Sequence, residues 1–87
     1  MARYELVFRK SVPRDFRPIP KKHVVFILQR IEALREELRP VGKEKLSGKE
    51  RYRLRQGVYR IIYEVAEDQL IVTMAKVAHR RHVHRGG

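Results

Sequence analysis

The sequence predicts an α+β fold in the order β-α-α-β-β-β, with an antiparallel-rich sheet and a helical hairpin packed on one face. Two stretches, residues 3–9 and 50–77, are rich in the apolar–polar alternation and the β-branched and aromatic residues typical of strands. Residues 20–39 instead repeat apolar side chains at helical spacing. The whole chain of 87 residues is long enough for a single domain, residues 1–87, with a thin core.

The first strand is expected over residues 3–9, where apolar side chains alternate with charged ones. The alternating apolar residues are Tyr4, Leu6 and Phe8. A short helix follows, because Ser11 can cap a helix whose first turn tolerates Pro13. Two further prolines confine this helix to residues before about Arg17.

A second helix is expected from Pro20, which suits a first turn, up to the residues before Pro40. Its apolar side chains recur every three or four positions and form one stripe. They are Val24, Ile27, Leu28, Ile31, Leu34 and Leu38. The two helices form a hairpin, and the stripe requires a sheet to cover it.

Three strands are expected over residues 50–56, 58–66 and 70–77. A tight turn at Gln56-Gly57 and a second turn at residues 67–69 make them antiparallel neighbours. One face of the middle strand is expected to pack under the helices, and it carries Tyr59, Ile61, Tyr63 and Val65. The opposite face of the sheet is left uncovered, and a tyrosine that reached it could stack on a base.

The net charge of +11, from 21 Lys and Arg against 10 Asp and Glu, is typical of a protein that binds a polyanion. Residues 43–60 hold seven bases and two acids, whereas residues 61–75 hold three acids and no base. Nucleic acid, an acidic protein and an anionic membrane are the candidate partners. The chain has no cysteine, which excludes disulfides and fits a reducing cytoplasm, and no signal peptide or membrane-spanning run is expected.

An arginine row stands out in the expected strand over residues 50–56. Arg51, Arg53 and Arg55 project from one face at intervals of about 6.6–6.8 Å, which matches the phosphate spacing of an extended single strand. Arg60 follows just past the turn, and its face depends on the strand register. A row of like charges costs stability, so an external anion is a natural explanation. The alternative is a solvated face that resists aggregation.

A second basic segment, residues 79–85, combines three histidines with arginines. Histidine titrates near neutral pH and can act as general acid or base beside arginines that bind phosphate. A zinc site is not expected, because no carboxylate or cysteine lies nearby in the sequence to complete it. A disordered basic tail is the alternative.

Several segments together resemble the RelE/ParE toxin superfamily of bacterial and archaeal toxin–antitoxin systems. The resemblance covers nearly the whole chain and is strongest from residue 45 onward. Its motifs are Lys45-Leu46-Ser47-Gly48, the run from Tyr52 to Glu64, and the run from Val77 to Arg85. Upstream, residues 10–16 and 19–20 fit the helical hairpin of the family.

RelE-like members are endoribonucleases that cut messenger RNA, usually in the ribosomal A site, by attack of the substrate 2′-hydroxyl on the adjacent phosphorus. The resemblance therefore implies an endoribonuclease that needs no metal or cofactor if side chains stabilise the charge and transfer the protons. The implied catalytic residues are Arg53, Arg60, Arg80 and His84. The implied RNA-contacting residues are Arg51, Arg55, Arg81, His79 and His82.

Two of the departures of this chain from the family pattern concern the side chains of the site. His84 stands where the family has a tyrosine, and arginines stand where RelE-like members often carry lysines. Because arginine keeps its charge, acid–base chemistry is assigned to His84, with His79 and His82 as alternatives.

Two other functions are compatible with the same resemblance, namely a ParE-type poison of DNA gyrase and a catalytically silent RNA-binding relative. The partners it implies are an acidic antitoxin protein and the ribosome with messenger RNA in the A site. Operator DNA is expected to be bound through the antitoxin, without direct sequence-specific recognition by this chain, and no membrane partner is expected.

Overall fold

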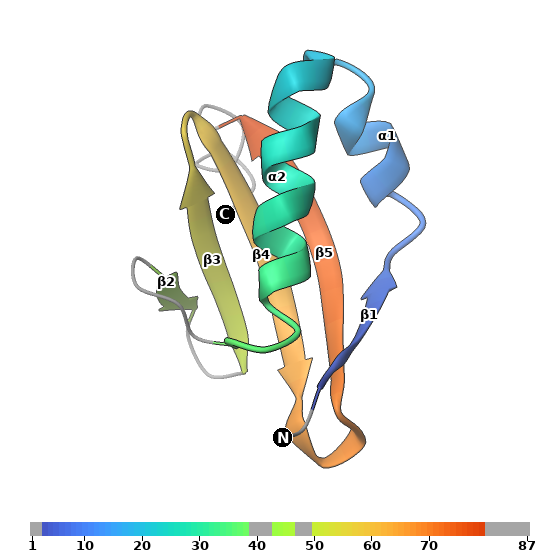
Figure 1. Cartoon of the computed structure of the whole chain (residues 1–87), viewed down its shortest axis with the longest axis vertical. Coiled ribbons are helices and arrows are strands. Elements are labelled where there is room, and N and C mark those ends of the chain that lie inside the picture. The colour runs from blue at the N-terminus through green and yellow to red at the C-terminus, as the bar shows by residue number, and fades with distance from the viewer. Residues whose placement is uncertain (1–2, 39–42, 47–49, 80–87) are drawn as a thin grey trace.

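The computed structural model describes residues 3–38, 43–46 and 50–79. Within these ranges, five strands form one sheet and two helices lie together in front of it, which confirms the predicted α+β class (Figure 1). In chain order the elements are β1 (Glu5–Phe8), α1 (Val12–Phe16), α2 (Lys21–Ala33), β2 (Lys43–Leu46), β3 (Arg51–Gln56), β4 (Tyr59–Ala66), a 3₁₀ turn (Glu67–Gln69) and β5 (Ile71–His79). None of the helices in these ranges is long and apolar enough to span a bilayer.

The sheet has the strand order β1-β5-β4-β3-β2. The strands β3, β4 and β5 are antiparallel neighbours as predicted, and β1 runs parallel to β5. The turn between β3 and β4 has Gly57 at a φ of +60°, as two-residue hairpin turns with glycine in the first central position require.

The strand β2 was not predicted from the sequence. It covers Lys43–Leu46 and pairs antiparallel with β3 at the edge of the sheet. Three of its four residues are charged, so its composition carries no strand signal. Charged side chains are nevertheless common on edge strands, where they prevent pairing with other molecules.

The core lies between the helices and one face of the sheet. The predicted inward face of β4 is confirmed, because Tyr59, Ile61, Tyr63 and Val65 are all buried in the main apolar cluster. Tyr52 on β3 is buried there too, and its ring stacks on that of Tyr63 with centroids 5.5 Å apart. The Tyr63 hydroxyl donates a hydrogen bond of 2.7 Å to the carbonyl of Leu38. The possibility that one of these tyrosines stacks a base on the open face is therefore wrong.

The helix α2 ends at Ala33, earlier than the predicted boundary before Pro40. The helical stripe is confirmed at Ile27 and Ile31, which are buried, but Leu28 is 42% exposed. Only a narrow face of this helix contacts the sheet, so a residue at the margin of the stripe stays in solvent.

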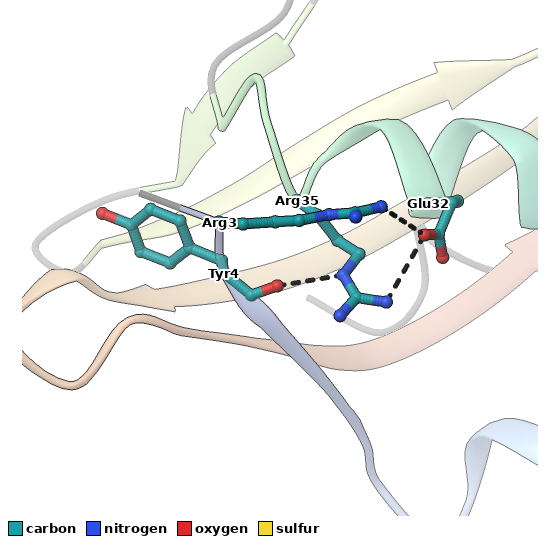
Figure 2. A network of polar contacts seen from close by, with 4 residues as sticks. All are labelled: Arg3, Tyr4, Glu32 and Arg35. Atoms are coloured by element: carbon teal, nitrogen blue, oxygen red, sulfur yellow. Dashed lines mark hydrogen bonds and ion pairs between the residues drawn. The ribbon is translucent and has the colours of Figure 1, made fainter. Parts of the chain in front are cut away.

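A polar network joins the start of β1 to the end of the helical segment, and Figure 2 shows its four residues. The Arg35 Nε donates to the carbonyl of Tyr4 at 3.0 Å, and the Tyr4 amide donates to the carbonyl of Arg35 at 3.1 Å. Glu32 accepts contacts of 3.4 Å from both Arg3 and Arg35. These contacts fasten the residues just before β1 to the end of α2 and the turn that follows it.

The strand β5 extends beyond its partner β1. The pairing with β1 ends at Phe8 opposite Met74, whereas β5 continues to His79. Along this second half, α1 lies beside β5 (Figure 1), and the Asp15 carboxylate accepts a hydrogen bond of 3.0 Å from the Val77 amide. The helix thus satisfies a backbone donor that would otherwise face outward from the sheet edge.

Candidate nucleic-acid interface

The open face of the sheet carries the arginine row. Successive residues of a strand point to opposite faces, and Tyr52 and Leu54 point into the core. The alternate residues of β3, Arg51, Arg53 and Arg55, therefore lie on the face that the helices leave uncovered.

The strand register determines the face of Arg60, which the sequence left open. Arg60 stands directly opposite Arg55 in the antiparallel ladder, and such partners share a face. Four arginines of β3 and β4 therefore meet on one surface, here called the basic face: Arg51, Arg53, Arg55 and Arg60. The two-residue turn at Gly57 sets this register, because it makes Gln56 the partner of Tyr59.

The four arginines differ in exposure. Arg60 is buried, with 8% of its surface exposed, whereas Arg55 is exposed and Arg51 and Arg53 are intermediate. A guanidinium withdrawn from water interacts more strongly with a nearby charge than one in bulk solvent. The basic face thus combines one deep cation with three that are more accessible.

Two carboxylates also lie on the basic face, and neither was predicted from the sequence to lie there. Glu44 on β2 is directly opposite Arg53 and accepts a hydrogen bond of 3.0 Å from its Nε and a second one from its Nη2. Glu64 on β4 contacts Arg9 at 2.9 Å and Arg51 at 3.7 Å. These contacts offset part of the positive charge of the row.

Three of the arginines lower the pKa of the Glu44 carboxylate. The hydrogen bond and the charge of Arg53 lower the pKa of Glu44 below its ordinary value, and the charges of Arg60 and Arg55 add to this effect. This carboxylate is therefore ionised at neutral pH.

The Arg55–Arg60 pair places two like charges directly opposite each other, an arrangement that destabilises a sheet. No ion pair of Arg55 occurs within residues 3–38, 43–46 and 50–79, whereas Arg51 and Arg53 each contact a glutamate. An anion beside Arg55 and Arg60 would be attracted by both positive charges, and guanidinium groups can donate several hydrogen bonds to phosphate.

The predicted C-terminal site residues divide into two groups. Arg80, Arg81, His82 and His84 lie outside the described residues. His79 is described, and it is not on the basic face. It pairs with Tyr59 in the ladder, and its ring meets the Tyr59 ring edge-on at 5.8 Å on the side of the helices.

His79 instead lines a pocket of about 430 Å³ between the α1 region and the end of β5. Arg14, Lys76 and Tyr59 also line it. Within the part of the chain that the structure describes, no three His, Cys, Asp or Glu side chains gather in a way that could hold a metal ion.

A sequence model described as the ParE toxin of the type II toxin–antitoxin system parDE matches residues 6–84. The chain therefore belongs to this toxin family, within the RelE/ParE superfamily that the sequence motifs resemble. None of the curated proteins is a significant match.

Solved structures with a similar fold include toxin–antitoxin complexes from several organisms. The RelBE2 complex of Mycobacterium tuberculosis matches with a TM-score of 0.77 at 21% identity, over 91% of this chain and 100% of that chain. The archaeal RelE–RelB complex of Pyrococcus horikoshii matches with a TM-score of 0.77 at 28% identity, over 88% of this chain and 94% of that chain. The RelB–RelE complex of Methanococcus jannaschii matches with a TM-score of 0.74 at 25% identity, over 92% of this chain and 96% of that chain. The fold is that of RelE toxins.

Proposed function

We propose that this toxin is a messenger RNA endoribonuclease that acts on the ribosome and inhibits translation. The observation that carries the proposal is the basic face, in particular the Arg55–Arg60 pair beside Arg53. A surface of this kind fits the phosphates of an extended RNA strand, and such a target puts the activity in the cytoplasm, where ribosomes meet messenger RNA.

The proposed reaction is cleavage by the 2′-hydroxyl of the substrate. The 2′-oxygen forms a bond to phosphorus as its proton passes to a base, and the bond from phosphorus to the 5′-oxygen breaks as that oxygen takes up a proton. The products are a 2′,3′-cyclic phosphate and a 5′-hydroxyl. The pentacoordinate intermediate carries extra negative charge, which Arg53 and Arg60 would stabilise by charge-assisted hydrogen bonds.

The proton transfers require a group other than arginine, because guanidinium stays charged throughout the accessible pH range. We assign them to His84, where the family has a tyrosine, since histidine can both accept and donate a proton near neutral pH. Arg80 is assigned a further phosphate contact, while Arg51 and Arg55 hold the neighbouring nucleotides.

The proposed protein partner is an acidic antitoxin. Two observations support it: the net charge of +11, and the similarity to structures from Mycobacterium tuberculosis and Methanococcus jannaschii that are described as complexes of a toxin with its antitoxin. Carboxylates of such a partner would complement the basic face and block RNA from it.

The experiment is a brief induction of the toxin in bacteria, followed by mapping of RNA 5′ ends. The wild type should produce new ends phased with the reading frame. The variant R53A/R55A should lose most of these ends, because both arginines are solvent-accessible and their removal takes two cations from the basic face. The matched control R14A/R17A removes two exposed arginines from the helical side and should cleave like the wild type. Equal cleavage by both double variants would refute the proposal.

The second candidate function is inhibition of DNA gyrase, which the match to the ParE toxin model favours. Supercoiling by purified gyrase, measured with and without the toxin, discriminates the two functions. Inhibition of supercoiling without phased RNA cleavage would favour the gyrase poison. Phased cleavage without inhibition would favour the nuclease.

A further inference from the structure

The Glu44–Arg53 pair is unusual for a surface that binds polyanions, because it puts a negative charge among the cations. The pair follows from the backbone register, in which Glu44 and Arg53 are directly opposite each other. Two hydrogen bonds join the carboxylate to the guanidinium, which therefore presents its donors to an internal acceptor.

The positive charges of Arg60 and Arg55 also attract the Glu44 carboxylate and help to keep it ionised. A carboxylate bonded to one guanidinium and attracted by two more uses the same donors that a phosphate oxygen on the basic face would need. Guanidinium binds both kinds of anion through the same fork of donors, so the two compete for Arg53.

We propose that Glu44 is an internal counter-ion of the basic face, which occupies Arg53 in the free protein and must be displaced by a phosphate of the bound polynucleotide. The inference deepens the proposed function and rests on it, since it names the residue that limits the affinity of the same surface for RNA. Glu44 is thus a specificity-determining residue: a ligand must offer enough negative charge to replace it.

The position of β2 allows the displacement. This strand has four residues, lies at the edge of the sheet and pairs only with β3 among the described strands. The Glu44 side chain is 61% exposed, so it can rotate into solvent without opening the core. Exposed ion pairs contribute little to stability, which keeps the cost of displacement low.

The test compares Glu44→Gln with the wild type and with the matched control Glu32→Gln. Glu32 is similarly exposed, at 53%, and also pairs with arginines, but it lies on α2 away from the basic face. Both variants change the net charge by the same amount. The probes are a heparin column and a fluorescein-labelled, unstructured RNA 12-mer followed by anisotropy.

Glu44→Gln should elute from heparin at higher salt than Glu32→Gln and bind the RNA about two- to fivefold more tightly. The RNA affinity of Glu44→Gln should also fall more steeply with salt, with a slope of log affinity against log salt concentration that is larger in magnitude by up to about 0.7. In the wild type the displaced carboxylate takes up a cation from solution, which offsets part of the cation release on binding, whereas an amide takes up none. Glu44→Asp keeps the charge and should resemble the wild type more than Glu44→Gln does.

Equal heparin elution and equal RNA affinity for Glu44→Gln and Glu32→Gln would overturn the inference, even if the wild type cleaves RNA. Weaker binding by Glu44→Gln would overturn it too, since the carboxylate would then act with the ligand. Conversely, later elution of Glu44→Gln in a protein that cleaves no RNA would support the internal counter-ion and refute the nuclease. The two proposals can therefore fail separately.

Discussion

Removal of the Asp15 carboxylate should destabilise the protein, because this side chain joins α1 to the half of β5 that extends beyond β1. Its Oδ2 accepts a partly buried hydrogen bond of 3.0 Å from the Val77 amide. Hydrogen bonds to charged groups contribute roughly 1.5–3 kcal/mol to stability, so Asp15→Ala should lower the free energy of unfolding by about 2 kcal/mol. For a chain of 87 residues this corresponds to a fall in Tm of about 8–16 °C.

The assay is urea and thermal unfolding followed by circular dichroism, with an unchanged m-value as the sign that the native state stays compact. Asp15→Asn keeps a neutral acceptor and should lose about 1 kcal/mol. Asp68→Ala, a change at an exposed position in the turn before β5, is the matched control and should stay within about 0.5 kcal/mol of the wild type. If Asp15→Ala and Asp68→Ala have the same free energy of unfolding, the stability of β5 does not depend on this contact.

Two further predictions concern the basic face and the turn beside it. In a carbon-13 NMR titration, Glu44 should titrate below its ordinary pKa, and Arg53→Ala should raise that pKa; an unchanged midpoint would contradict the ion pair. The pair should be complete at neutral pH and lost as the pH falls through the depressed pKa. Gly57→Ala should cost about 1–2 kcal/mol in denaturant unfolding because of its φ of +60°, while no atom lies within 4 Å to obstruct the added methyl group. If Gly57→Ala left the free energy of unfolding unchanged, the turn would have to adopt a conformation without a positive φ at this residue.

The alternation of residues along the strands was sufficient to predict the two faces of the sheet. A period of two puts Tyr52 and Arg53 on opposite sides whatever else the chain does, so the arginine row was predictable. The face of Arg60 follows from the length of the turn at Gly57, a local feature of the sequence. Local chemistry thus determined most of the basic face.

The carboxylates of the basic face could not be predicted in the same way. Glu44 belongs to an edge strand with three charges in four residues, and its contact with Arg53 depends on the pairing of two segments rather than on either one. The exposure of Leu28 has a similar origin, because the width of the helix face that the sheet covers is set by tertiary packing. Such features depend on how elements meet in space.

The parallel pairing of β1 with β5 has a consequence for how the chain matures during translation. The first strand to leave the ribosome has its ladder partner in residues 71–74, so it must wait for most of the chain to be synthesised. The meander β3-β4-β5 joins sequence neighbours, but it also includes β5, the last strand that the structure describes. Neither β1 nor the meander can therefore complete the sheet before residues 71–79 have been synthesised, so the described fold closes in one late step around β5.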